Sequence, residues 1–147
     1  MQLTGQCSFT DHEVKSKLTQ KRKLAQCILR LLHHYTGKQA LIQYTFVSDA
    51  FLYNMNLKHL QHDDYTDIIT FDLSEPNNEM LTIDIYISTE RVKENAKLHQ
   101  VSYATELLRV IFHGALHIAG FGDKTAKAKL KMRAEEDFWI QEFLTHA

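Results

Sequence analysis

Apolar residues follow two different periods along this chain. In 81–87 they alternate strictly with polar or aromatic residues, and one face of the extended segment carries Leu81, Ile83, Ile85 and Ile87. Alternation of this kind predicts a strand with one face in a hydrophobic core. Residues 16–36 instead have helical spacing, with Gly37 placed to end the helix. From residue 89 onward the helical period dominates.

Composition and capping residues assign the other segments. The expected elements, in chain order, are a weak strand at 3–9, the helix at 16–36, a strand at 40–47, a helix from a Ser48-Asp49 cap to about Leu60, a polar turn at 62–66, a strand at 68–71, a turn at 75–78, the strand at 81–87, a helix capped by Thr89 and ending near Leu98, a helix from Ser102 to about Ala119, and a last helix at 125–145. This order predicts an α+β fold with a small mixed central sheet and about five helices. We expect one domain spanning residues 1–147.

The overall composition is that of an ordinary globular protein, with 44% hydrophobic and 24% charged residues. No apolar run approaches the roughly 20 residues that span a bilayer, and the N-terminus lacks the pattern of a signal peptide. Cys7 and Cys27 are too few for a disulfide framework. We therefore expect a cytoplasmic protein with two reduced thiols and no membrane partner.

The net charge of −1 taken alone disfavours a nucleic-acid-binding protein. The cations are nevertheless clustered, because two stretches hold 12 of the 17: Lys15, Lys17, Lys21, Arg22, Lys23, Arg30 and Lys38 in the first, and Lys124, Lys127, Lys129, Lys131 and Arg133 in the second. A phosphate-binding surface and two solvated helix faces are both open interpretations.

The segment 113–123 carries most of the functional information. His113 and His117 lie four residues apart, so both imidazoles fall on one face of a helix. Gly120 can end that helix in the left-handed conformation, and the returning chain can bring Asp123 to the same point. Two histidines and one carboxylate, with a fourth position open to water, are the arrangement of catalytic zinc. We expect one zinc ion on this central helix, bound by His113, His117 and Asp123.

The rest of this helix is mostly apolar, so its polar residues form one narrow stripe of about 80°. The stripe consists of Glu106, Arg109, His113 and His117. It could simply face water. Glu106 could also assist catalysis beside the two histidines, or it could pair with Arg109 three residues later.

Imidazole and carboxylate ligands suit zinc better than magnesium or calcium. Zinc can activate a water molecule at neutral pH. In the zinc-protease motif His-Glu-x-x-His the Glu is the general base, and here Gly114 occupies that position. The chain keeps the ligand spacing and lacks the proteolytic base.

Several ordered motifs resemble those of the YbeY family of single-strand-specific endoribonucleases, which are rRNA maturation factors. The family pattern His-Gly-x-Leu-His-Leu-x-Gly-Tyr-Asp-His is similar to 113–123, and Thr-Asp-Val-Leu-Ser-Phe is similar to 66–71. Further matches are Ile83-Asp84-Ile85, Ile87-Ser88 and Glu106-Leu107. The resemblance covers roughly residues 40–140.

This resemblance implies an α+β fold, a zinc ion, and hydrolysis of RNA phosphodiesters in maturation of the small-subunit rRNA 3′ end and in ribosome quality control. It also implies rRNA and the small ribosomal subunit as partners. His113 and His117 match the family's ligands, whereas Asp123 replaces a third His. The family's Arg falls on Leu60, with Lys58 and His59 as neighbouring candidates for its role.

Two other functions fit the same residues. One is a metal-dependent hydrolase of another substrate, including a peptidase, against which Gly114 argues. The other is a ribosome-associated protein with structural zinc, which would need a fourth protein ligand such as His99 or His146.

Overall fold

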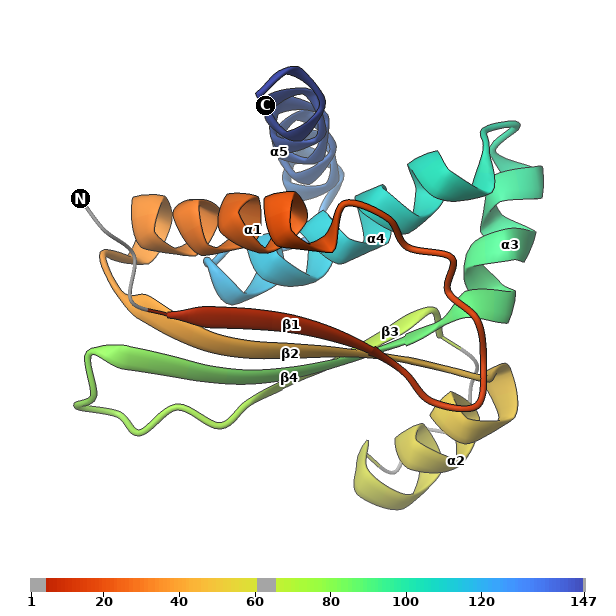
Figure 1. Ribbon diagram of the computed structural model, residues 1–147, viewed down its shortest axis with the longest axis horizontal. Helices are drawn as coiled ribbons and strands as arrows, with labels where there is room; N and C mark the ends of the chain where they lie inside the picture. The colour runs from red at the N-terminus through yellow and green to blue at the C-terminus, as the bar shows by residue number, and fades with distance from the viewer. Residues whose placement is uncertain (1–4, 61–65, 147) are drawn as a thin grey trace.

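A four-stranded mixed sheet forms the centre of the computed structural model, which describes residues 5–60 and 66–146 (Figure 1). The elements are β1 (Gln6–Asp11), α1 (Lys21–Thr36), β2 (Gln39–Val47), α2 (Asp49–Leu60), β3 (Ile68–Asp72), β4 (Met80–Ser88), α3 (Thr89–Leu98), α4 (Tyr103–Ile118) and α5 (Ala126–Thr145). The predicted α+β class, the mixed sheet and the five helices are confirmed.

The strands are arranged in the order β1-β2-β4-β3. β1 and β4 each run parallel to β2, and β3 runs antiparallel to β4. Figure 1 shows α1 and α4 lying together over one face of the sheet, with α5 beyond them, and α2 on the opposite side. The sheet therefore supports α4, the helix that carries the two histidines.

The hydrophobic core lies between the sheet and the pair α1–α4. Alternate residues of β2 and β4 enter it, and Ile42, Tyr44, Ile83 and Ile85 are almost completely buried. The Tyr44 hydroxyl donates to the Ile111 carbonyl of α4 at 2.9 Å. Because a buried hydroxyl needs a partner, this bond fixes α4 on the sheet. The alternation predicted for 81–87 is confirmed.

The first helix begins later than predicted. Lys17 and Gln20 have φ values of 59° and 55°, a left-handed conformation that cannot continue a right-handed helix. Ser16 is instead buried, and its backbone N–H donates to the Asp11 carboxylate at 3.2 Å. The helical spacing therefore becomes a helix only from Lys21, and Gly37 ends it as predicted.

Two other boundaries differ from the prediction. The first strand covers Gln6–Asp11 rather than 3–9, because its register follows the parallel neighbour β2; residues 3 and 4 lie outside the described part. The Ser88 side chain, not that of Thr89, caps α3 by accepting from the Arg91 N–H at 3.1 Å. Most of the predicted turn at 62–66 also lies outside the described residues. None of the described helices is long and apolar enough to cross a bilayer.

Cys7 and Cys27 are both free thiols, and burial raises the pKa of Cys7 to about 12. Little thiolate exists at pH 8, so we expect Cys7 in the folded chain to react with dithionitrobenzoate roughly 100-fold more slowly than an exposed thiol. Stopped-flow absorbance measures this rate, and unfolding in guanidinium chloride should release both thiols at once. Rapid reaction of Cys7 in the folded protein would show that β1 is not packed as described.

Candidate metal centre

The end of α4 reverses the chain direction. Gly120 has a φ of 109°, and its N–H donates to the His117 carbonyl at 3.1 Å. The Phe121 N–H donates to the Leu116 carbonyl at 3.0 Å. This pair of bonds is the Schellman motif, which needs a residue that tolerates positive φ. The predicted helix end at Gly120 is confirmed, and the returning chain places Asp123 beside α4.

His113 and Asp123 meet as the sequence predicted. The His113 Nε2 atom lies 3.4 Å from the Asp123 Oδ2 atom. The carboxylate is partly open, with 44% of its side chain exposed. The imidazole and the carboxylate thus face each other at a solvent-accessible point.

The other nitrogen of His113 is held by α5. His113 Nδ1 lies 2.8 Å from Glu136 Oε2, and Glu136 is only 5% exposed. A carboxylate at this distance accepts a hydrogen bond, so Nδ1 carries the proton and Nε2 points towards Asp123. The hydrogen bond to Glu136 raises the pKa of His113 most, and the charges of Glu136, Asp67 and Asp123 add to this effect against burial. The surroundings of His113 therefore favour the protonated, positively charged form of its imidazole.

Arg109 completes the contact between α4 and α5. Its guanidinium donates to Glu136 at 3.0 Å and to Asp137 at 2.8 Å. Burial opposes its charge, but the hydrogen bonds to Asp137 and Glu136 outweigh burial and raise the pKa of Arg109. Arg133 lies 3.8 Å from the same Glu136 carboxylate. Glu136 is thus fixed by cations on one oxygen while the other holds His113.

The pair between Glu106 and Arg109, one of the roles left open for Glu106, is not found in residues 5–60 and 66–146, because α5 offers Arg109 two carboxylates. Glu106 is 5% exposed and its Oε1 atom lies 3.4 Å from His99 Nδ1. The polar stripe of α4 consequently does not simply face water. Its first part is covered by α3 and α5, and only His117 in the last turn is exposed.

Asp67 is a further acidic residue of this region. Burial raises the pKa of Asp67, while the charge of His113 lowers it and those of Glu106 and Glu136 raise it again. The Asn95 side-chain amide donates to its Oδ2 atom at 3.4 Å. No role was predicted for Asp67 from the sequence, where it entered only as part of the motif at 66–71. Its position directly before a strand could have marked it as a candidate site residue. Glu136 was missed entirely, although it belongs to an acidic run, 135–137, that directly follows the basic stretch.

The three predicted ligands are brought together in part. In residues 5–60 and 66–146, no group of three or more His, Cys, Asp and Glu side chains lies in position to hold a metal ion. His117 is exposed one turn from His113, and no ion pair or hydrogen bond to its ring is found in the described part of the chain. His99 and His146, the candidates for a fourth ligand, pair with Glu106 and Glu142.

The donor chemistry nevertheless fits zinc. Two ligand atoms about 2.0–2.1 Å from a tetrahedral ion lie about 3.3 Å apart, and His113 Nε2 and Asp123 Oδ2 are 3.4 Å apart. A metal-binding histidine usually donates its other N–H to a carboxylate, as His113 does to Glu136. His117 lies one turn further along the same helix, at i+4 from His113, and its side chain is exposed.

Comparison with known proteins identifies the family. Residues 6–144 match the family described as Endoribonuclease YbeY. The chain belongs to the YbeY endoribonuclease family. Three relatives with that name illustrate the similarity. The protein from Cytophaga hutchinsonii is 51% identical over 65% of this chain and 66% of its own length. The one from Bacteroides fragilis ATCC 25285 is 39% identical over 88% and 92%, and the one from Flavobacterium johnsoniae is 35% identical over 90% and 94%.

The fold is also similar to a solved structure. The solution structure of a Thermotoga maritima protein superposes with a TM-score of 0.64 at 26% identity, covering 93% of this chain and 88% of that one. The family resemblance expected from the motifs is therefore confirmed. In this YbeY chain the family's Arg position, Leu60, is at the end of α2, and its side chain lies outside the described part.

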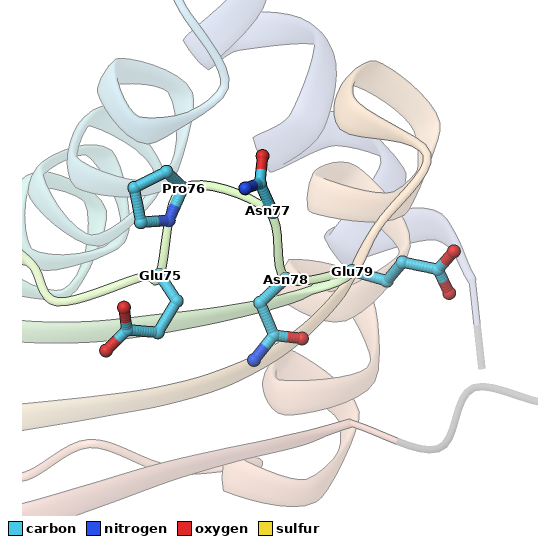
Figure 2. Close-up of a pocket in the computed structure, with 5 residues that line it drawn as sticks. All are labelled: Glu75, Pro76, Asn77, Asn78 and Glu79. Atoms are coloured by element: carbon cyan, nitrogen blue, oxygen red, sulfur yellow. The ribbon is translucent and has the colours of Figure 1, made fainter.

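A hollow is also present at the turn before β4, where it is lined by the consecutive residues 75–79. Figure 2 shows the carboxylates of Glu75 and Glu79 pointing in different directions rather than towards a common point. A hollow with two acidic groups and no cation in its lining would repel phosphate. It is not a candidate active site for a YbeY protein.

Proposed function

We propose that this chain is a zinc-dependent endoribonuclease that cleaves single-stranded RNA. The observation that carries the proposal is the placement of His113 between two carboxylates, with Asp123 facing one ring nitrogen and buried Glu136 accepting from the other. Membership of the YbeY family supports the reaction type. The metal ligands would be His113, His117 and Asp123.

Each residue of the centre has a separate task in this proposal. A bound zinc ion supplies a nucleophile at neutral pH and positive charge beside the scissile phosphate. His113 and Asp123 would hold the ion, with His117 as the third ligand. Glu136 keeps the His113 Nδ1 atom protonated, so that Nε2 has its lone pair directed outward. Arg109 holds the Glu136 carboxylate in place by donating to it at 3.0 Å.

The proton released in hydrolysis needs an acceptor, and Asp67 and Glu106 are two carboxylates of this region that hold neither the proposed metal nor His113. Asp67 is held by the Asn95 amide and senses the charges of His113 and Glu106. Glu106 is more deeply buried and engaged with His99. Asp67 is therefore the better general base at its carboxylate oxygen, and Glu106 would act by positioning.

The proposed biological substrate rests on the resemblance of the sequence motifs to the YbeY family, whereas the names of the relatives say only that they are endoribonucleases. As an endoribonuclease of this family, the protein would mature the 3′ end of small-subunit rRNA in the cytoplasm, contact the small ribosomal subunit, and take part in ribosome quality control. The whole chain, residues 1–147, would act as one domain. The basic residues that follow Asp123, from Lys124 to Arg133, would contact phosphate and make binding dependent on salt.

Metal analysis combined with an RNA cleavage assay tests the proposal. The parent should bind one zinc ion and cleave a single-stranded RNA, whereas His117→Ala should lose both. Zinc retained in full by His117→Ala would remove that residue from the site. Zinc bound by a parent that cleaves no RNA would favour the structural alternative.

The Glu136→Gln variant probes the carboxylate behind His113. Glutamine keeps the shape but accepts a weaker, uncharged hydrogen bond, so we expect zinc affinity to fall by about 10–100-fold. Competition with a chromophoric chelator measures the affinity. Glu142→Gln is the matched control, because Glu142 also lies on α5 and pairs with an imidazole, that of His146 at 3.2 Å. Equal affinities of the two variants would show that Glu136 does not support the site.

A further inference from the structure

A cavity of about 270 Å³ lies next to the metal centre, and the proposed function does not use it. Its lining consists of Tyr35, Ala119, Gly120, Phe121, Gly122, Ala128 and Lys131. The loop from Ala119 to Gly122 leads directly into Asp123, whose carboxylate faces His113. The cavity therefore borders the proposed metal site, because Gly122, which lines it, directly precedes Asp123 in the chain.

Two aromatic rings form the wall of the cavity. The rings of Tyr35 and Phe121 meet edge to face, with centroids 5.0 Å apart and planes at 81°. Both side chains are only half-buried. Both residues line the cavity, and nucleic-acid-binding proteins hold unpaired bases by stacking them on aromatic side chains.

The Tyr35 ring is held firmly in place. Its hydroxyl donates a short hydrogen bond to the Glu135 carboxylate and accepts one from Trp139 Nε1 at 3.2 Å. His34 and Trp139 also contact the Tyr35 ring edge to face. A ring fixed by its own protein loses little conformational entropy when a ligand binds.

The cavity also carries a positive charge. Lys131 lines it, and the ammonium group lies 5.8 Å from the centre of the Phe121 ring. The Phe121 and Gly122 backbone adds polar groups beside it. An aromatic face next to an ammonium group complements a nucleotide, which has a planar base and an anionic phosphate.

We propose that this cavity is a subsite for one unpaired nucleobase of an RNA strand, with Lys131 contacting the adjoining phosphate. The inference rests on the proposed function, because it places RNA at the metal centre. The volume lies just below the range of about 300–1,000 Å³ that is typical of small-molecule pockets, which suits one base with its ribose. A paired and stacked base cannot enter such a cavity, so the subsite selects single strands.

Fluorescence anisotropy of a short, labelled, phosphorothioate-linked RNA on the zinc-loaded full chain tests the subsite. Phe121→Leu removes the ring and keeps apolar bulk, and Ala128→Met fills the cavity without removing a contact. Each should weaken binding by about tenfold, the contribution of one stacked base. Lys131→Gln should weaken binding and reduce its salt dependence by about one phosphate contact.

Matched controls come from outside the cavity and outside the basic stretch 124–133. Phe138→Leu changes an exposed phenylalanine of α5 and Lys97→Gln an exposed lysine of α3, and neither residue lines the cavity. Both variants should bind RNA as the parent does. An RNA with one abasic ribose, moved along the strand, should reproduce the Phe121→Leu loss at one position. With the abasic ribose at that position, Phe121→Leu should cause no further loss of RNA binding.

Unchanged RNA binding by folded Phe121→Leu and Ala128→Met proteins would overturn the subsite even if the parent cleaves RNA. Weakened binding in both variants, with an abasic effect that depends on Phe121, would support the subsite even if no cleavage occurs. Thermal melting of each variant separates loss of binding from loss of folding. A parent that does not bind RNA would overturn the subsite and the proposed function together.

Discussion

Replacing His113 with alanine is expected to remove zinc from the protein and to lower RNA cleavage by on the order of 10³-fold or more. The imidazole, a ligand in the proposed site, lies between Asp123 and Glu136, 3.4 Å from the former and 2.8 Å from the latter. Its loss leaves two carboxylates facing each other across a gap, without the nitrogen ligand that zinc favours. The metal would supply several kcal/mol of stabilisation to the charge that develops on phosphate.

Inductively coupled plasma mass spectrometry and single-turnover cleavage measure the two effects. His12→Ala is the control, since His12 is an exposed imidazole directly after β1 that contacts Glu13 at 4.0 Å and the Phe51 ring, and lies outside the proposed site. Parent-like zinc content in His113→Ala would show that the metal, if any, binds elsewhere.

The Gly114→Glu variant is expected to fail to fold or to lose more than about 4 kcal/mol of unfolding free energy. This change would restore the zinc-protease motif in sequence. Gly114 is buried, and an added Cβ atom would lie 2.9 Å from Ile68 Cδ1 and 3.1 Å from Ile85 Cδ1. A glutamate here would place a charge between two isoleucines without a partner, which is among the most costly changes in a core.

Gly114→Ala separates the effect of charge from that of size. The contacting atoms are the ends of flexible side chains, and alanine improves helix propensity by about 1 kcal/mol, so this variant should stay within about 1 kcal/mol of the parent. Urea unfolding followed by circular dichroism measures both variants. A Gly114→Glu protein as stable as the parent would show that this helix face does not pack on the sheet, and the argument against a peptidase would lose its structural basis.

Local patterns predicted much of this molecule because they depend on neighbouring residues. The alternation in 81–87 and the caps at Ser102 and Gly37 each follow from rules that act within a few residues. The same holds for the turn at Gly120, which brought Asp123 back to His113. These features were enough to predict the α+β class and the approach of Asp123 to His113.

Long-range contacts were not predictable in the same way. Glu136 lies 23 residues after His113 in sequence, and nothing local shows that α5 packs its acidic run against α4. For that reason the i+3 pair of Glu106 and Arg109 seemed reasonable, although tertiary packing gives Arg109 stronger partners. The start of α1 was also mispredicted, because left-handed residues such as Gln20 carry no glycine signal.

Anomalous diffraction at the zinc edge from crystals of the zinc-loaded protein tests the central claim most directly. We predict a single peak about 2.0–2.2 Å from a ring nitrogen of His113, a ring nitrogen of His117 and a carboxylate oxygen of Asp123, with Glu136 still bonded to His113 Nδ1. A peak whose ligands exclude His113, or a fully loaded crystal with no zinc between α4 and Asp123, would contradict the account.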